Sequence, residues 1–135
     1  MEQIEVKTII KAPLSQVWEC WTLPEHIVNW NFASTDWHCP KAENNLHVGG
    51  EFHYLMEAKD GSFNFDFWGT YITVEERKHL EIRIGDGRRM SVAFESLENE
   101  TLIKERFEPE TVHTVELQKT GWQMILDNFK LYVEQ

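Results

Sequence analysis

The sequence predicts an α+β domain in which a curved antiparallel sheet packs around one long C-terminal helix. Two observations support this fold class. Between residues 51 and 108, five runs of alternating apolar and polar residues are separated by turn sequences, which is the pattern of an antiparallel meander. From residue 115 to residue 133, apolar residues recur at helical spacing. This helix has one apolar face, and the sheet is the layer that can cover it.

The N-terminal residues predict a strand and then a helix. Apolar residues or Thr occupy alternate positions from Ile4 to Ile10, which is the period of a half-buried strand. Pro13 suits the start of a helix, where its missing N–H costs little. The residues that follow form one apolar stripe at positions i, i+3, i+4 and i+7, namely Leu14, Val17, Trp18 and Trp21.

A second, short helix is expected next. Thr22 and Glu25 have the spacing of a capping box, and Ile27 and Trp30 supply an apolar side. From residue 31 to residue 48 the periodicity is weak, so we expect an irregular loop with one short strand near residues 37–41. The pair Gly49-Gly50 then indicates a sharp bend, because no phosphate-binding motif follows it.

The five runs define strands and the faces of those strands. They span residues 51–58, 62–74, 80–84, 90–97 and 101–108, with turns such as Asp60-Gly61 between them. Successive side chains of a strand point to opposite faces of the sheet. Residues that share the expected inner face are Phe52, Tyr54 and Met56; Phe63, Phe65, Phe67, Gly69 and Tyr71; Met90, Val92 and Phe94; and Ile103, Glu105 and Phe107.

The last helix has its apolar stripe opposite a polar one. The apolar stripe consists of Val115, Trp122, Ile125, Leu126, Phe129 and Val133. Gly121 lies inside this helix, where Gly costs about 1 kcal/mol relative to Ala. We therefore expect that Gly121 allows close approach to another backbone.

Length and composition favour a single domain, residues 1–135. The chain is long enough for one core, and it shows no repeat, linker, secretory signal or membrane-spanning apolar run. Its formal net charge of -10 opposes binding to nucleic acids and to anionic membranes. The pair Arg88-Arg89 sits in an expected turn and is interpreted as solvated charge. Cys20 and Cys39 are expected to remain thiols in a cytoplasmic protein.

The inward aromatic residues are candidates for the walls of a ligand pocket. A strongly curved sheet around one helix can leave an interior that side chains do not fill. Flat ligand surfaces would stack on the rings, and phenol groups would orient a polar edge. The alternative is ordinary core packing. The candidates are Phe52, Tyr54, Met56, Phe65, Phe67, Tyr71, Phe94 and Trp122.

Glu105 is the most informative single candidate. Its parity places a carboxyl group between Ile103 and Phe107 on the inner face. Desolvation would favour the protonated acid, which could serve as a polar anchor, a proton donor or a base. The structural alternative is a carboxyl group that a Trp, a Tyr or a backbone amide satisfies by hydrogen bonding. A bulge that turns Glu105 outward is the third alternative.

The loop residues Trp37 and His38 are included as contacts at the rim of the pocket. Neither a metal site nor a catalytic Cys-His pair is expected. His38 and Cys39 are adjacent, which gives no metal-ligand spacing, and adjacent side chains on an extended segment point apart. Adding His53 to this pair does not produce the spacing of a metal-binding motif either. The sequence carries no cofactor motif and no catalytic triad order, so we predict no cofactor and regard an enzyme as the less favoured class.

Several short motifs together resemble one known family over essentially the whole chain. They are Ala12-Pro13 with Val17-Trp18, Trp37-His38-Cys39-Pro40, Val48-Gly49-Gly50-Glu51-Phe52, Gly69-Thr70-Tyr71, and Gly121-Trp122 leading into Ile125-Leu126 and Phe129. The chain resembles homologues of the heat-shock-protein-90 ATPase activator, within the START-like, birch-pollen-allergen-like (SRPBCC) superfamily. The resemblance implies the helix-grip fold and a cavity between sheet and C-terminal helix that takes apolar molecules.

The sequence thus leads to a main hypothesis and two alternatives. The main hypothesis is a domain that binds a small hydrophobic or aromatic molecule, with Tyr54, Tyr71 and Glu105 as polar contacts. One alternative is an enzyme of cyclase, dehydratase or hydrolase type, in which Glu105 or His38 moves the proton. The other is a chaperone-associated or stress-linked interaction module, for which an exposed apolar patch would be the sign; a homodimer could cover the same patch.

Overall fold

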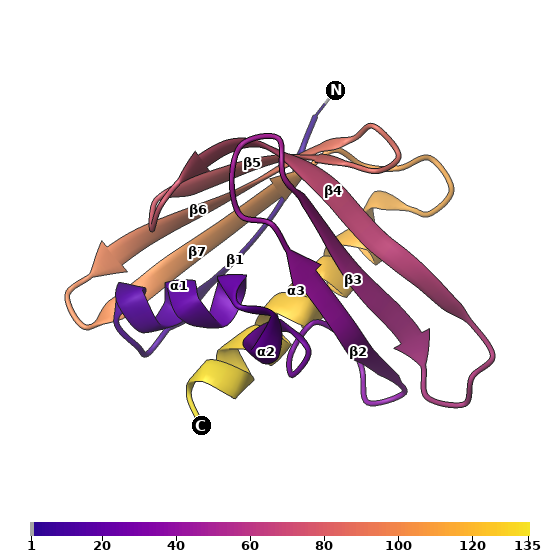
Figure 1. Ribbon diagram of the computed structural model, residues 1–135, viewed down its shortest axis with the longest axis horizontal. Helices are drawn as coiled ribbons and strands as arrows, with labels where there is room; N and C mark the ends of the chain where they lie inside the picture. The colour runs from indigo at the N-terminus through magenta and orange to yellow at the C-terminus, as the bar shows by residue number, and fades with distance from the viewer. Residues whose placement is uncertain (1) are drawn as a thin grey trace.

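A computed structural model describes residues 2–135 and shows one curved antiparallel sheet that arches over a long helix (Figure 1). The order of strands across the sheet is β1-β7-β6-β5-β4-β3-β2. The predicted helix-grip fold is confirmed. The strands are β1 (Ile4–Ile10), β2 (Trp37–Asn44), β3 (Glu51–Ala58), β4 (Asn64–Glu75), β5 (His79–Ile84), β6 (Arg89–Leu97) and β7 (Glu100–Phe107), and the helices are α1 (Leu14–Thr22), α2 (Pro24–Ile27) and α3 (Val115–Val133).

Strands β2 to β7 are a meander of neighbouring hairpins, whereas β1 crosses the sheet to pair with the last strand. Ile4 of β1 lies opposite Phe107 of β7, and Ile10 lies opposite Thr101. The five strands predicted between residues 51 and 108 are all present, with ends that differ from the prediction by at most two residues. The predicted inner face is also correct for the buried residues Phe52, Tyr54, Met56, Tyr71, Met90, Val92, Phe94, Ile103, Glu105 and Phe107.

The short helices close one end of the sheet. In α1, Val17 and Trp18 are buried, as the apolar stripe predicted. The predicted capping box at Thr22 is wrong, because Thr22 is the last residue of α1 and its hydroxyl donates to the Trp18 carbonyl at 2.7 Å. Helix α2 instead begins with Pro24, which needs no N–H partner, and Leu23 is its N-cap residue.

Strand β2 is longer than the short strand expected near residues 37–41. It pairs with β3 up to Asn44, which lies opposite Phe52. The register shifts between His38 and Lys41, and Pro40 falls within this irregularity. This bulge interrupts the alternation of side chains, which explains why the sequence pattern was weak here.

Gly50 makes the predicted sharp bend before β3. A Cβ atom at this position would lie 2.1 Å from the backbone oxygen of Asn45, so only glycine fits. The preceding Gly49 has a φ of 85°, in the region that favours glycine. The bend directs β3, and with it Phe52 and Tyr54, along the concave face.

Helix α3 lies across the concave face, against β1 (Figure 1). The Thr114 side chain caps it by accepting from the Leu117 N–H at 3.1 Å. Residues Leu126, Phe129 and Val133 are buried as predicted. Val115 was assigned to the same stripe and is exposed instead, because the first turn extends beyond the sheet's cover.

The expected close approach at Gly121 is also wrong. Apart from its chain neighbours and the backbone of its own helix turn, no atom lies within 4 Å of where a Cβ would stand. This glycine therefore faces open space. Its neighbour Trp122 turns inward and stacks on Phe107, with ring centroids 3.8 Å apart and planes at 10°. This stacking fixes how the first half of α3 meets the sheet.

An aromatic cluster forms where α1, the segment after α2, α3 and β6 meet. Trp21 packs on Trp30, Phe94 and Phe129, with ring centroids 4.9 to 5.7 Å apart. Trp30 also donates from its indole N–H to the Cys20 carbonyl at 2.9 Å. This aromatic cluster fills one end of the space under the sheet and leaves the middle of the space less occupied.

Candidate functional site

A cavity of about 270 Å³ lies between the concave face of the sheet and α3. Strands β3 to β7 form its sheet side, α3 forms the opposite side, and α1 with the segment after α2 closes one end. Its walls are mainly aromatic and aliphatic. The lining residues are Trp21, Trp30, Asn31, Phe52, Tyr54, Met56, Phe65, Phe67, Tyr71, Leu80, Ile82, Arg88, Met90, Val92, Glu105, Trp122 and Ile125.

Most of the residues proposed from the sequence lie on this wall. Strand parity placed them on the inner face, and the sheet's curvature brings them around a common space. Those found on the wall are Phe52, Tyr54, Met56, Phe65, Phe67, Tyr71, Glu105 and Trp122. Their contact with a ligand remains a prediction.

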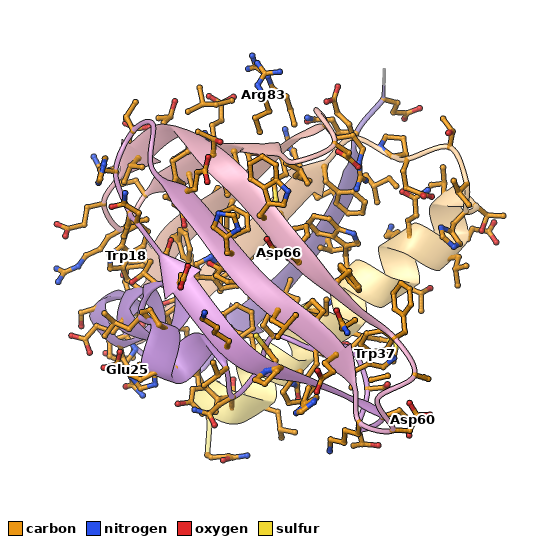
Figure 2. All side chains as sticks on the ribbon, turned by 45° about the vertical axis from the view of Figure 1, so that its right-hand side comes forward. Trp18, Glu25, Trp37, Asp60, Asp66 and Arg83 are labelled. Atoms are coloured by element: carbon orange, nitrogen blue, oxygen red, sulfur yellow. The ribbon has the colours of Figure 1, made fainter. Side chains whose placement is uncertain are left out.

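The other three proposed residues lie elsewhere. Trp37 packs against Phe63 and Phe65 at centroid distances of 6.0 Å, near the Asp60 turn of the β3–β4 hairpin (Figure 2). His38 pairs with Glu57 at 2.8 Å on the outer side of the sheet. Both were expected at the pocket rim: Trp37 does not line the cavity but packs on the wall residue Phe65, whereas His38 faces outward.

Phe94 has the predicted inward orientation but not the predicted place on the wall. It contacts Trp18 and Trp21 at centroid distances of 5.2 and 5.7 Å. It lies farther along β6 than Val92, under α1. The packing alternative therefore describes Phe94.

Sequence reasoning missed several wall residues, for two different reasons. Met90, Val92 and Ile125 were placed on an inner face or apolar stripe but not proposed as ligand contacts, and neither were Trp21, Trp30, Leu80 and Ile82, which lie in or beside regularly patterned segments. For Asn31 and Arg88 the sequence gave no such signal. Both lie outside the helices and strands, where side-chain direction has no period.

Glu105 is buried on the cavity wall, with 6% of its surface exposed. Its neighbours across the sheet are Val6 on β1 and Val92 on β6, whose side chains cannot donate a hydrogen bond. Burial raises the pKa of Glu105 to about 8. The carboxyl group is thus mainly protonated at neutral pH.

The carboxyl oxygens of Glu105 accept and donate no hydrogen bond within residues 2–135, so the structural alternative of an internal partner is wrong. Throughout those residues, every polar side-chain atom that is sealed from all free space does have a partner. The oxygens of Glu105 are not sealed in this way, because Glu105 lines the cavity. A molecule in the cavity is what could satisfy them.

Two phenol groups form a second polar feature on the β3–β4 side of the wall. The Tyr71 hydroxyl donates to Oδ1 of Asn44 at 2.6 Å, and the Asn44 amide donates to the Thr22 carbonyl at 2.7 Å. Burial raises the pKa of Tyr71 to about 12. Burial also raises the pKa of Tyr54, and the neighbouring Tyr71 hydroxyl adds to this effect. Both phenols are neutral at physiological pH and can orient a polar ligand group.

Asn31 is a third polar group on the wall, and it is poorly satisfied. It is 6% exposed, and its amide donates to the Met56 sulfur at 3.4 Å, a weak acceptor. A ligand oxygen would be a better partner for this amide.

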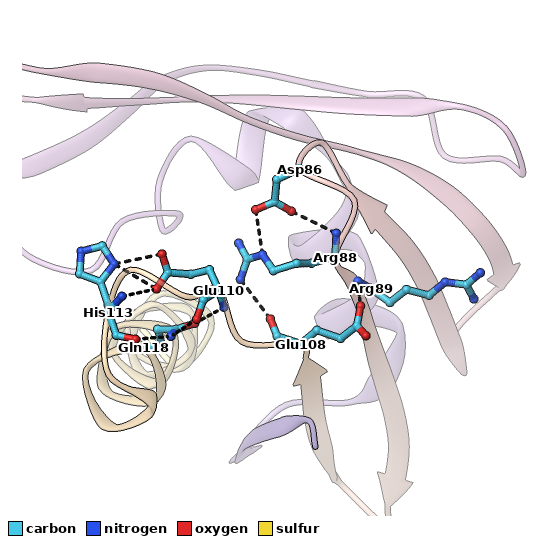
Figure 3. Close-up of polar contacts among 7 residues, drawn as sticks. All are labelled: Asp86, Arg88, Arg89, Glu108, Glu110, His113 and Gln118. Atoms are coloured by element: carbon cyan, nitrogen blue, oxygen red, sulfur yellow. Dashed lines mark hydrogen bonds and ion pairs between the residues drawn. The ribbon is translucent and has the colours of Figure 1, made fainter. Parts of the chain in front are cut away.

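Arg88 approaches the cavity from the turn between β5 and β6. Its Nε donates to Asp86 at 2.8 Å and its Nη1 donates to the Glu108 carbonyl at 3.1 Å (Figure 3). Beyond Glu108, Gln118 of α3 donates to the carbonyls of Glu110 and His113 at 3.1 and 2.9 Å. These contacts tie the turn and the segment before α3 into one end of the cavity. Asp86 balances the charge of Arg88 there.

Other reactive side chains are not among the residues that line the cavity. Cys20 and Cys39 are free and buried, and burial raises the pKa of both thiols. His53 lies on the outer face, between Asp66 at 2.7 Å and Glu51 at 2.9 Å, and hydrogen bonds to both carboxylates raise its pKa. No three His, Cys, Asp or Glu side chains of the described residues converge as metal ligands would. In the same part of the chain, no helix has the length and apolar character needed to cross a bilayer.

Comparison with solved structures gives strong similarities along nearly the entire chain. An AHSA1-like protein from Aeromonas hydrophila is 44% identical, with a TM-score of 0.93, over 98% of this chain and 92% of that one. A protein from Cytophaga hutchinsonii is also 44% identical, with a TM-score of 0.85 and the same coverage. A protein from Chromobacterium violaceum, 19% identical with a TM-score of 0.86 over 100% of this chain and 99% of that one, shares the fold.

No match to this chain was found among curated proteins. The family model described as activator of Hsp90 ATPase homolog 1-like protein matches residues 11–134. This match covers the cavity walls from α1 to α3 and agrees with the family that the sequence motifs indicated. The chain therefore belongs to the family of activator of Hsp90 ATPase homolog 1-like proteins.

Proposed function

We propose that this protein binds a small, mainly aromatic molecule in the cavity between the sheet and α3, as a cytoplasmic binding protein. The observation that carries the proposal is a 270 Å³ cavity with a buried, unpartnered carboxyl group on an otherwise mainly apolar wall. An apolar cavity of about 150 Å³ can hold benzene, so this one has room for about two fused rings. Natural cores are close-packed, and a space of this size is uncommon without an occupant.

The arrangement of the wall supports binding of a flat molecule. Phe67 meets the edge of Trp122 at a centroid distance of 6.2 Å, and Phe52 packs on Tyr54 at 4.7 Å. These rings come from the sheet and from α3, so they offer stacking surfaces on both sides of the space. Among the few polar groups on the wall, Glu105 and the two phenols would fix the ligand's orientation.

Titration calorimetry with naphthalene tests the proposal directly. Val92 lies on the wall and is fully buried, so Val92→Phe places a ring in the cavity beside Glu105. The neighbouring Ala93→Phe adds the same ring on the opposite face of β6 and is the matched control. We expect binding to the wild type and to Ala93→Phe, and at least a tenfold loss of affinity in Val92→Phe.

Native mass spectrometry of the purified protein adds an independent measurement. A co-purified small molecule that Val92→Phe no longer retains would support the proposal and identify the ligand's chemical class. If naphthalene binds Val92→Phe as well as it binds the wild type, the cavity is not the site and the proposal is wrong. Thermal melting of each variant establishes that a loss of binding is not a loss of folding.

A further inference from the structure

We infer that the ligand is an uncharged, flat molecule with a carbonyl oxygen, and that Glu105 recognises this oxygen by donating the O–H of its protonated carboxyl group. This inference rests on the proposed function and adds the chemical class of the ligand. The surroundings of Glu105 decide whether the group acts as an acid or as an anion.

The surroundings of Glu105 contain nothing that would stabilise a negative charge. From β1 and β6 the facing residues are Val6 and Val92, and from α3 the wall residues are Trp122 and Ile125. The charged residues next to Glu105 along β7, Lys104 and Arg106, belong to the opposite face of the strand. A carboxyl group in such surroundings stays neutral and has one O–H to donate.

The other titratable or charged groups on the wall are Tyr54, Tyr71 and Arg88. The phenols are neutral, and Tyr71 already donates to Asn44. Arg88 directs its Nε to Asp86 and its Nη1 to the Glu108 carbonyl. No charged group on the wall is therefore directed at Glu105. Its pKa of about 8, which burial raises, agrees with this geometry.

A ligand cation is the alternative partner for Glu105, and the energetics disfavour it. An ion pair in the cavity would require desolvation of both charges, at several kcal/mol per ion. A hydrogen bond between a neutral acid and a carbonyl oxygen requires no charge to leave water. The neutral pairing also leaves the aromatic walls free to stack on the ligand's ring system.

Three naphthalene derivatives of nearly equal shape separate these cases. The probes are 2-acetylnaphthalene, which carries the carbonyl; 2-isopropenylnaphthalene, in which a CH₂ group replaces the oxygen; and 1-(2-naphthyl)ethylamine, which carries a cation. Calorimetry at pH 6.5 should show that the ketone binds about tenfold more tightly than the hydrocarbon, the value of one neutral hydrogen bond. The amine should bind more weakly than the ketone.

The preference for the ketone should depend on pH through Glu105. Above pH 8 the carboxyl group loses its proton, so the ketone preference should disappear. In Glu105→Gln the amide N–H₂ still donates and does not titrate, so the preference should persist at every pH. Glu105→Leu has no donor, so it should bind ketone and hydrocarbon equally.

The outcomes distinguish this inference from the proposed function. If the hydrocarbon binds in the cavity and the ketone gains nothing, or if the amine binds most tightly and releases a proton to buffer, the assignment of a neutral carbonyl ligand is overturned while the cavity remains a binding site. If none of the three probes binds, the proposed function itself fails, and this inference fails with it.

Discussion

At the scale of single residues, Glu105 lowers the stability of the fold while it gives the cavity a polar group for a ligand. A buried acid without an internal partner costs free energy of folding, and an apolar side chain there would be more stable. The position lies in the centre of β7, between Ile103 and Phe107, which are both fully buried. Such a departure from the pattern of a core strand is expected at functional sites.

The stability of the protein should therefore depend on pH through Glu105. Its pKa is raised from 4.5 to about 8 in the folded state, so the folded state holds one more proton than the unfolded state between these values. The contribution of Glu105 to the free energy of unfolding is therefore fully present below pH 4.5 and is lost as the pH rises to 8. In Glu105→Gln this fall should be smaller by about 4 kcal/mol.

Urea unfolding of both proteins at half-unit steps from pH 5 to pH 9 measures this difference. Glu95→Gln, an exposed position on β6, is the matched control and should follow the wild type. Parallel curves for the wild type and Glu105→Gln would contradict the assignment of Glu105 as a buried neutral acid.

Gly50 allows a second prediction at the residue scale. In Gly50→Ala the new Cβ would meet the Asn45 carbonyl oxygen, which belongs to the backbone and cannot move aside freely. We expect a loss of about 2–3 kcal/mol in the free energy of unfolding. Urea unfolding would show it as a lower midpoint with an unchanged slope. A midpoint equal to that of the wild type would mean that the bend does not need glycine.

At the scale of elements, the predictions succeeded where a period was regular and failed where the chain was irregular. Strand alternation placed Tyr54, Tyr71 and Glu105 on one face, because a strand has only two faces to choose from. The bulge in β2 broke that alternation, so the length of the strand could not be predicted. Arg88 lies in a turn, where tertiary contacts with Asp86 and Glu108 determine its direction.

Helix α3 shows the limit of a periodic pattern at its ends. The stripe gave the buried residues Leu126 and Phe129 correctly. It could not indicate that the sheet ends before the first turn, which leaves Val115 exposed. Nor could sequence alone distinguish a glycine at a helix contact from one that faces open space, as Gly121 does.

The open surroundings of Gly121 predict a stabilising substitution. Gly121→Ala should raise the free energy of unfolding by about 1 kcal/mol, because alanine has the higher helix propensity and meets no neighbour within 4 Å. Thermal and urea unfolding both measure the gain. A destabilised Gly121→Ala variant would show that α3 approaches another surface at this point.

At the scale of the whole molecule, the sheet and α3 are held together around a space that neither fills. The aromatic cluster of Trp21, Trp30 and Phe129 closes one end, and the Arg88 contacts hold the turn and the segment before α3 at another part of the wall. An occupant would add contacts to both layers at once. Folding and binding are then linked, because a ligand that binds the folded state alone stabilises it.

This linkage predicts the thermal effect of the ketone probe. At a hundred times its dissociation constant, 2-acetylnaphthalene should add about 2.7 kcal/mol and raise the melting temperature by roughly 10 °C. Differential scanning calorimetry measures the shift. Val92→Phe should show a much smaller shift, because the added ring occupies part of the space that the probe needs. An equal shift in both proteins would indicate binding outside the cavity.

The pairing of β1 with β7 has a consequence for how the chain acquires its structure. Strands β2 to β7 are neighbours in sequence as well as in the sheet, so each can pair with the strand before it as soon as it forms. Ile4 cannot pair with Phe107 until β7 has been synthesised, so this pairing closes a long loop of the chain. Strand β1 is therefore made well before its partner β7, and a nascent chain halted before residue 100 would expose β1 as an unpaired edge to chaperones and proteases.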